Sequence, residues 1–160
     1  MNSTIPLAQH PAMLRPYTPA DQPHLLHIFR YYVPHFFGAE EEADFLKFLI
    51  NEADHYFVYQ KGNRIAGAGG YAIKGKTGRL AWYLTDDEFR GQGIGRALVQ
   101  HSLDALKQHN GIDQIQVRTS QHANVFFGHF GFETRAVVSD YWTKGLDLYD
   151  MYLNGVLVGK

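Results

Sequence analysis

Apolar residues recur at helical spacing in the first third of the chain. Leu25, Ile28, Phe29 and Tyr32 stand at i, i+3, i+4 and i+7, so one face of a helix would carry all four. The preceding residues 18–21 read Thr-Pro-Ala-Asp. A threonine suits the N-cap, a proline suits the first helical position, and an acid suits the first turn. The pattern predicts a helix that begins here and packs by one face.

Two later segments show the same spacing. Residues 40–53 predict a second helix and residues 92–109 a third. The apolar side expected for the second helix consists of Leu46, Leu49, Ile50 and Ala53. The apolar side expected for the third consists of Ile94, Ala97, Leu98, Ala105 and Leu106. A shorter helix is expected at residues 123–130, directly before a Gly-Phe pair.

Short runs rich in aromatic and β-branched residues, bounded by turn residues, are typical of strands. We expect strands at residues 13–17, 56–60, 64–74, 79–85, 113–119, 134–139 and 146–153. The second, third and fourth strands are joined by tight turns and are therefore antiparallel, whereas the fifth follows a crossover helix and should lie parallel to the fourth. Gly67, Gly69 and Gly70 indicate a bulge or a close backbone approach in the third strand.

The order of these elements is β-α-α-β-β-β-α-β-α-β-β. It predicts an α/β (α+β) fold with a single mixed, mostly antiparallel sheet of six to seven strands and helices on both faces. A length of 160 residues fits one domain, residues 1–160, and no linker or repeat divides it. Residues 1–12 are polar and contain two prolines, so we expect a loose lead-in there.

The glycine-rich residues 90–96, RGQGIGR, lie between a predicted strand and the third helix. Free backbone N–H groups and the helix dipole favour an anion at a helix N-terminus. Glycines there let the backbone approach such an anion, and arginines can add charge-assisted hydrogen bonds. The loop is a candidate pyrophosphate site, and the alternative is a glycine-rich helix start without a ligand. The candidate residues are Arg90, Gly91, Gln92, Gly93, Ile94, Gly95 and Arg96.

Two other nucleotide motifs fit this loop less well. A Walker A loop needs Gly-Lys followed by Ser or Thr, which the chain lacks. A dinucleotide fingerprint places Gly-x-Gly-x-x-Gly early in a βαβ unit. Here the third glycine comes one residue too early, and the preceding strands form an antiparallel meander.

Three stretches of the chain together resemble the GNAT family of N-acetyltransferases. Arg90-x-x-Gly93-x-Gly95 matches the family's Gln/Arg-x-x-Gly-x-Gly/Ala signature, which holds the pyrophosphate of CoA. Residues 14–21 look like the family's opening strand and helix, and residues 119–132 look like its later CoA-side motif. The resemblance covers most of the chain. It implies the GNAT fold, acetyl-CoA as co-substrate, and direct attack of an amine on the thioester.

The resemblance also implies CoA contacts outside the loop. In the family, the strand that enters the glycine loop splays from its neighbour and binds the pantetheine arm, and Leu84 and Thr85 occupy that place. Phe127 stands where many members have a tyrosine that protonates the leaving thiolate. Ser120 stands where many have a CoA-contacting asparagine, for which the nearby Asn124 could substitute.

Acetyl transfer to an amine needs a base more than an acid. A lysine-like amine with a pKa of about 10.4 is deprotonated to roughly one part in 2,500 at pH 7, a penalty of about 4.6 kcal/mol. Expelling a thiolate with a pKa of about 8.5 leaves only about 2 kcal/mol for an acid to recover. The candidate catalytic residues are Glu41, in a segment that borders the acceptor site in the family, and His122, at the end of the fifth strand. Asp86, Asp87 and Glu88 are more typical of a solvated loop.

Composition narrows the classes of function. Lys plus Arg (15) against Asp plus Glu (16) gives a net charge of −1, which offers no footprint for nucleic acid or an anionic membrane. The chain has no cysteine, so thiolate chemistry is excluded and a reducing cytoplasm is expected. No apolar run has the length of a membrane span, and the start does not resemble a signal peptide. His24 and His27 lack identifiable partners, so we expect no metal site.

The sequence leaves the acceptor open. We expect acetyl-CoA and a small-molecule or peptide amine as partners, and the exposed C-terminal strands would allow a homodimer. Aromatic residues near the second helix and the last turn either pack the core or line a cleft for an amine on an apolar or flat scaffold. They are Tyr31, Tyr32, His35, Phe36, Phe37, Tyr141 and Trp142. The alternatives are a non-catalytic acyl-CoA-binding sensor or partner module, and an unrelated domain with an empty glycine loop.

Overall fold

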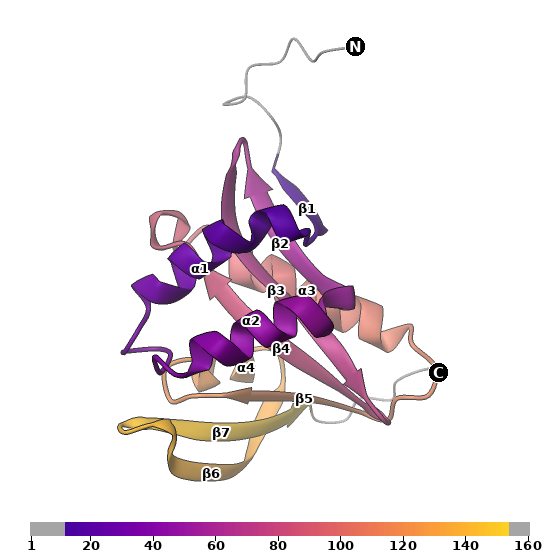
Figure 1. The fold of residues 1–160 in the computed structure, drawn as a ribbon. Coiled ribbons are helices and arrows are strands. Elements are labelled where there is room, and N and C mark those ends of the chain that lie inside the picture. The colour runs from indigo at the N-terminus through magenta and orange to yellow at the C-terminus, as the bar shows by residue number, and fades with distance from the viewer. Residues whose placement is uncertain (1–11, 154–160) are drawn as a thin grey trace.

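The structure, a computed structural model, describes residues 12–153. Its centre is one seven-stranded sheet in the order β1-β2-β3-β4-β5-β7-β6 (Figure 1). The strands are β1 (Met13–Pro16), β2 (Tyr56–Lys61), β3 (Arg64–Lys74), β4 (Thr77–Thr85), β5 (Gln114–Thr119), β6 (Phe132–Thr143) and β7 (Leu146–Leu153). Only the pair β4–β5 is parallel. The predicted fold class is confirmed, whereas the lead-in expected at residues 1–12 lies, apart from Ala12, outside the described residues.

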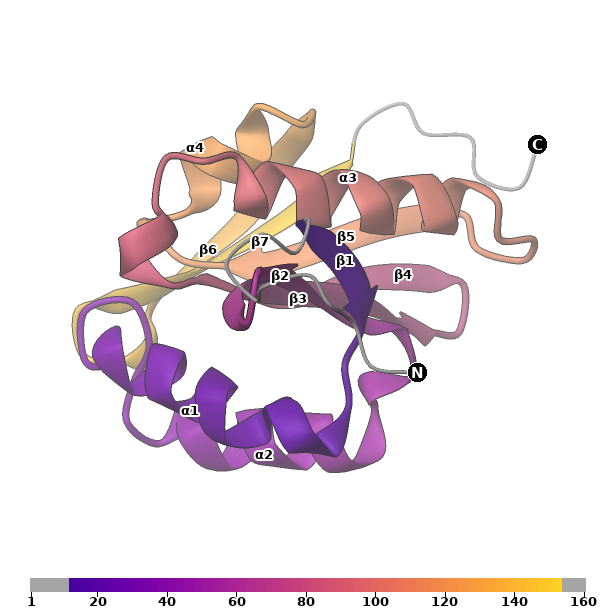
Figure 2. The same ribbon diagram turned by 90° about the horizontal axis from the view of Figure 1, so that it is seen from above.

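Helices cover both faces of the sheet (Figure 2). The helices α1 (Gln22–Tyr31) and α2 (Glu41–Asn51) lie on one face, and α3 (Ile94–Lys107) and α4 (Asn124–Gly128) lie on the other. Three 3-10 turns complete the elements: η2 (Pro19–Asp21), η3 (Ala53–His55) and η4 (Asp87–Phe89). The two-sided arrangement matters because a passage through the sheet would connect two separate surfaces.

The first helical segment begins at Thr18, as its sequence predicts. The backbone N–H of Thr18 donates to Asp21 Oδ2 at 2.8 Å, and Pro19 occupies the first position of η2. Arg15 from β1 grips the same carboxylate with two hydrogen bonds of 2.9 and 2.8 Å. Asp21 is 5% exposed, so this cap is also a buried ion pair that ties the helix to the edge strand.

The predicted apolar side of α2 is only partly correct: Leu49 is buried and Ala53 packs against the core as predicted, but Ile50 points to solvent. Ile50 is 74% exposed, whereas Phe45, Phe48 and Leu49 are buried. The Phe45 ring stacks on Phe29 of α1 with centroids 5.5 Å apart. Two sets of apolar residues stand at helical spacing on this segment, and the set with the larger aromatic area faces the core because it removes more apolar surface from water.

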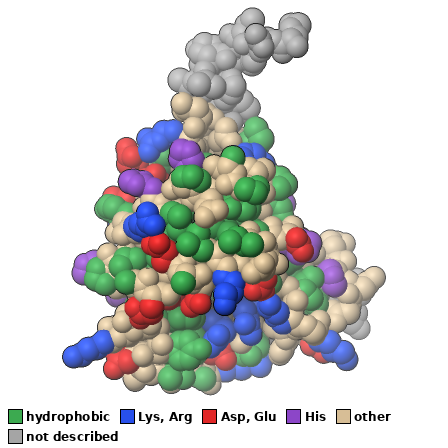
Figure 3. Space-filling view, in the orientation of Figure 1, with side chains coloured by type: hydrophobic (Ala, Val, Ile, Leu, Met, Phe, Trp, Pro, Cys, Tyr) green, Lys and Arg blue, Asp and Glu red, His purple; other side chains and the backbone are tan. Residues whose placement is uncertain are grey.

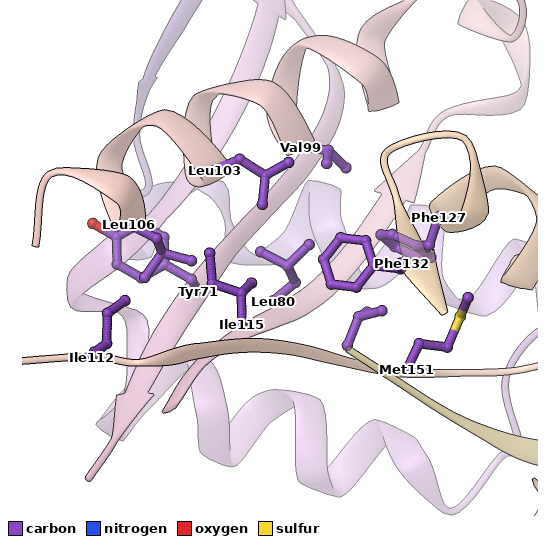
Figure 4. Close-up of a cluster of buried hydrophobic side chains, with 11 residues drawn as sticks. Tyr71, Leu80, Val99, Leu103, Leu106, Ile112, Ile115, Phe127, Phe132 and Met151 are labelled. Atoms are coloured by element: carbon purple, nitrogen blue, oxygen red, sulfur yellow. The ribbon is translucent and has the colours of Figure 1, made fainter. Parts of the chain in front are cut away.

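Two apolar clusters sit on opposite faces of the sheet. On the α3 face, Val99, Leu103 and Leu106 lie over Leu80 and Ile115 of the neighbouring strands (Figure 4). The other cluster joins α1 and α2 to the sheet through Leu25, Ile28, Phe29, Phe45, Phe48, Leu49, Tyr56, Val58, Ala68 and Leu84. Ile94, Leu98 and Leu106 are buried as the periodicity of the third helix predicts.

The glycines of β3 occupy places of close approach, as predicted. A Cβ at Gly70 would lie 2.1 Å from the carbonyl oxygen of His55, and one at Gly69 would lie 2.4 Å from the Tyr83 ring. The register between β3 and β4 shifts between Ala68 and Gly70. The bulge predicted in β3 is present beside Gly67, where the register with β2 shifts. The shift opposite Gly69 instead puts the extra residue in β4, next to the candidate site.

Candidate active site

The strands β4 and β5 separate after a short paired stretch. Their register ends with Arg79 opposite Gln116, although β4 continues to Thr85. Beyond that point β5 pairs only with β7 on its other side. The splay implied by the family resemblance is thus present. Backbone N–H and C=O groups along the open edge of β4 lack a neighbouring strand, so those without a side-chain partner are available to a ligand.

A cleft of about 1010 Å³ opens at this splay. It is lined by the glycine loop and the start of α3, by β4 and β5, by the loop after β5, and by α2. The predicted site residues that line it are Glu41, Leu84, Thr85, Arg90, Gly91, Gly93, Ile94, Gly95, Arg96, Ser120, His122 and Phe127. Gln92 and Asn124 are not among the lining residues. Gln92 instead accepts a hydrogen bond from Lys61 at 2.5 Å.

The glycine loop has the backbone that its composition suggests. Gly93 is the N-cap of α3 with φ of 78°, a left-handed conformation that suits glycine. Its carbonyl accepts the first helical hydrogen bond, from Ala97 at 3.0 Å. The N–H groups of the first turn have no partner within the helix. Because Ile94, Gly95 and Arg96 line the cleft, these donors and the positive end of the helix dipole face its mouth.

The three acids of the η4 loop are all engaged. Asp86 accepts from the backbone N–H of Glu88 at 2.9 Å, and Glu88 pairs with Arg64 at 2.6 Å. Asp87 pairs with Arg90 at 2.8 Å. These contacts fit a structural loop better than a catalytic base.

Trp82, in the wall of the cleft, has a backbone conformation that could not be predicted from the sequence. Its φ is 53°, which is unusual for a bulky residue and costs roughly 1–3 kcal/mol. The hydroxyl of Tyr56 donates to the Trp82 carbonyl at 2.5 Å, and the Phe45 ring lies 5.0 Å from the indole. These tertiary contacts hold the strained backbone beside the open edge of β4.

The neighbouring Thr85 turns its backbone toward the gap. The N–H of Asp86 donates to Ala66 of β3 at 2.8 Å. In an antiparallel pair the inward-facing groups alternate, so the N–H and C=O of Thr85 point away from β3. The Thr85 carbonyl accepts from the Tyr32 hydroxyl at 2.6 Å. Tyr32 was predicted on the apolar face of the first helix and among the aromatic residues of the core or the cleft, and its polar contact could not be predicted from the sequence.

Glu41 is a buried acid in the cleft. It is the first residue of α2, it is 7% exposed, and its Oε2 accepts the backbone N–H of Gly38 at 2.7 Å. Burial raises the pKa of the Glu41 carboxyl to about 7. The group is therefore divided between its acid and its base form near neutral pH.

His122 lies in the loop after β5, exposed at the same cleft. Its ring contacts Phe36 edge-on, with centroids 4.9 Å apart. Its backbone N–H donates to the hydroxyl of Ser120 at 3.2 Å, and the Ser120 carbonyl accepts from Asn124 at 3.0 Å. Ser120 therefore shapes the turn that presents His122.

Phe127, which stands where many family members have a tyrosine, packs in the interior of the protein. Phe127 is 4% exposed and meets the ring of Tyr83 edge-on at 5.9 Å. The Tyr83 hydroxyl donates to Ser102 at 2.7 Å, and burial raises its pKa well above the ordinary range. Neither residue offers a proton to a leaving thiolate.

Of the aromatic residues considered for the acceptor side, four line the cleft: Tyr32, Phe36, Phe37 and Trp142. Tyr31, His35 and Tyr141 do not. The indole N–H of Trp142 donates to the Thr119 carbonyl at 3.1 Å. Between residues 12 and 153, no three His, Asp or Glu side chains are grouped as metal ligands would be. In the same range, no helix has the length and apolar character needed to cross a bilayer.

Comparison with known proteins agrees with this geometry. A family model described as the acetyltransferase (GNAT) domain matches residues 33–154. A curated relative, N-alpha-acetyltransferase RimI of Mycobacterium tuberculosis, is 27% identical over 115 residues, which cover 68% of this chain and 72% of the relative.

Two solved structures show the same fold. Ard1 of Thermoplasma volcanium superposes with a TM-score of 0.75 at 17% identity, covering 89% of this chain and 97% of that one. Arabidopsis thaliana Naa50, in complex with the bisubstrate analogue CoA-Ac-MVNAL, has a TM-score of 0.71 at 19% identity and covers 89% and 98%. With the family match over residues 33–154, the chain belongs to the GNAT acetyltransferase family and is an acetyl-CoA-dependent N-acetyltransferase.

Proposed function

We propose that acetyl-CoA binds with its pyrophosphate at the glycine loop and its pantetheine arm along Leu84 and Thr85. The observation that carries this proposal is the splay of β4 from β5, which opens a cleft from the N-terminus of α3 to the α2 side of the sheet. The outward backbone groups of Thr85 suit the amides of a pantetheine arm. Arg96 forms no ion pair with any described residue, and its charge is free for a phosphate.

In the proposed reaction an amine attacks the acetyl carbonyl carbon. A carbon–nitrogen bond forms, the carbon–sulfur bond breaks, and CoA leaves as a thiolate that takes a proton from solvent. Backbone N–H groups on the open edge of β4 stabilise the negative charge that develops on the carbonyl oxygen. The amine loses its proton to a base at the cleft, directly or through water.

Glu41 is the better candidate for this base, and His122 is the second. The Glu41 carboxyl, with a pKa of about 7, is largely ionised slightly above neutral pH and remains basic enough to accept a proton. His122 contacts Phe36 at the same opening. The two assignments are separable because replacing the true base lowers kcat/KM, whereas replacing the other leaves it nearly intact.

A peptide N-terminus is the proposed acceptor. The bisubstrate analogue bound to Naa50 carries the residues MVNAL, and the curated relative is an N-alpha-acetyltransferase. The aromatic walls formed by Phe36, Phe37 and Trp142 suit an apolar first side chain. Acetylation of aromatic or apolar N-termini above charged ones is the expected preference, and a preference for small anionic acids would contradict it.

Thermal shift with acetyl-CoA, ATP and NAD at equal concentration tests the cofactor site. Acetyl-CoA at about a hundred times its Kd stabilises the fold by about 2.7 kcal/mol, or about 5 to 10 °C in Tm. We expect this shift to shrink in Arg96→Ala and in Gly93→Val. It should persist in Lys107→Ala, a matched change at the far end of α3. Equal shifts with all three nucleotides, or none with acetyl-CoA, would refute the proposed site.

A further inference from the structure

The arginines of this chain fall into two groups. Four of the eight arginines pair with carboxylates: Arg15, Arg30, Arg64 and Arg90. Arg79, Arg96, Arg118 and Arg135 form no ion pair with the described residues. Three of these four line the cleft, namely Arg79, Arg96 and Arg118. Arg96 belongs to the glycine loop, which leaves two cleft arginines without an assigned role.

Neutral groups hold both of these side chains in place. The Nε of Arg79 donates to Gln116 Oε1 at 2.9 Å, and the buried Gln116 is itself bound to Asp150 at 2.7 Å and to Tyr152 at 2.9 Å. This fixes the Arg79 stem and leaves its two terminal nitrogens without a described partner.

Arg118 is held by aromatic residues. One terminal nitrogen donates to the Tyr141 hydroxyl at 2.8 Å, and the guanidinium lies over the rings of Tyr141 and Trp142 at 5.1 and 5.8 Å. A cation that packs on aromatic faces keeps its charge and its remaining donors. Both arginines are thus held in position without a direct ion pair to a described carboxylate.

The two arginines lie on the face of the sheet opposite the glycine loop. On β5, Ile115 and Val117 belong to the cluster under α3, so Gln116 and Arg118 point to the α2 face. Arg79 bonds to Gln116 and shares that face. Figure 3 views this side, where Lys and Arg side chains gather below the middle of the surface. These two arginines would therefore bind a different anion from the CoA pyrophosphate, which the proposed function places at the start of α3.

Neither arginine forms an ion pair with a described carboxylate, although Asp150, opposite Arg118 on β7, shares their face and accepts from Gln116 at 2.7 Å. Lys74 pairs with Glu52, and Lys47 and Asp44 on α2 both line the cleft and offset one another. Glu41, with a pKa of about 7, carries only part of a charge near neutral pH. The terminal nitrogens of Arg79 and the remaining donors of Arg118 therefore stay available to an anionic group in the cleft.

The distance along β4 from Trp82 to Arg79 indicates which residue of a peptide acceptor would carry the negative charge. Arg79 precedes Trp82, at the distorted part of the strand, by three residues, or roughly 10 Å. An extended peptide covers the same length in about three residues. Resting on the proposed function, we propose that Arg79 and Arg118 select peptide acceptors with an acidic side chain at position 2, 3 or 4.

Three sets of synthetic octapeptides test this inference. Within a set, the peptides are identical except for Glu, Gln or Lys at position 2, 3 or 4, and kcat/KM is measured at saturating acetyl-CoA. In the wild type, Glu at one of these positions should exceed Gln by about tenfold or more, with Lys lowest. The preference should fall below about threefold in Arg79→Gln and Arg118→Gln, with the KM for acetyl-CoA unchanged.

Arg135→Gln is the matched control, because Arg135 lies on β6 outside the cleft and should retain the full preference. Arg118→Gln also guards against misfolding, since within residues 12–153 the Arg118 side chain donates one hydrogen bond, to the exposed Tyr141. Equal turnover of Glu and Gln peptides by the wild type overturns the inference. So does a preference that survives in both arginine variants.

Free glutamate and glutamine form a separate arm of the experiment. Acetylation of glutamate in preference to every peptide would assign the arginines to a small-molecule carboxylate and overturn the peptide source. Absence of turnover with all peptides, while acetyl-CoA still raises the Tm, would reject the peptide acceptor and this inference together. Loss of the Tm shift itself would instead mark failure of the proposed cofactor site.

Discussion

Replacing Glu41 by glutamine should change how the stability of the protein depends on pH. The glutamine keeps an oxygen that can accept the N–H of Gly38, but it cannot ionise. Burial raises the pKa of Glu41 from an ordinary 4.5 to about 7. A carboxyl with a raised pKa in the folded state favours folding in its neutral form. Its contribution is complete below pH 4.5 and is lost as the pH rises through about 7.

The size of the effect follows from the two pKa values. Each pKa unit corresponds to about 1.36 kcal/mol, so a rise from 4.5 to about 7 corresponds to roughly 3 kcal/mol. The wild type should lose about this free energy of unfolding, relative to Glu41→Gln, between pH 4.5 and pH 8. Urea denaturation of both proteins at half-unit pH steps measures the difference.

Glu42→Gln provides a control of opposite sign. Arg30 lowers the pKa of the neighbouring Glu42, so ionisation of Glu42 stabilises the fold. Its variant should therefore lose stability relative to the wild type as the pH rises. Parallel stability curves for Glu41→Gln and the wild type would refute a raised pKa at position 41, and with it the reasoning that selects this acid as the base.

Three further outcomes are expected. If Glu41 is the base, kcat/KM falls about 10²- to 10⁴-fold in Glu41→Gln but changes little in His122→Gln, and steady-state thiol release measures both; the reverse result assigns the base to His122. Gly70→Ala should destabilise by about 1–3 kcal/mol or more in urea, because its Cβ would lie 2.1 Å from a carbonyl oxygen of η3; an unchanged midpoint would contradict the packing described for β3. Asp21→Ala should lower the free energy of unfolding by about 3–5 kcal/mol, because it leaves the partly buried Arg15 without its carboxylate. Arg30→Ala breaks an exposed pair and should cost less, so a larger loss in Arg30→Ala than in Asp21→Ala would contradict this.

The features that depend on residues close together in the chain could be predicted from the sequence. The bounds of β3 and β7 match the predicted strands, because turn residues enclose each of them. The glycine loop was recognisable because left-handed residues at a helix start require glycine. The full buried side of α2 was not, since two overlapping apolar sets occur there and contacts with distant aromatic residues, Phe29, Tyr56 and Trp82, select between them.

Other parts of the candidate site depend on contacts between distant residues. The strained backbone of Trp82 is held by Tyr56, twenty-six positions away, and nothing near Trp82 in sequence requires it. Arg79 forms no ion pair within residues 12–153 and is held by Gln116 instead, and such pairing across strands cannot be predicted from one strand. Single-sequence periodicity identifies which residues face a core, but it does not show which polar groups remain unmatched.

The parting of β4 from β5 also has a mechanical consequence. In the described part of the chain, the two halves of the sheet are joined by three residue pairs between β4 and β5, the last of which is Arg79 with Gln116. The helix α3 braces this seam, with Leu106 packed against both Gly78 and the neighbouring strand. A short ladder and one packed helix therefore hold the two halves of the sheet together. Shortening Leu106 should weaken this junction and change the separation of β4 from β5, and so should affect substrate binding from a position remote from either substrate.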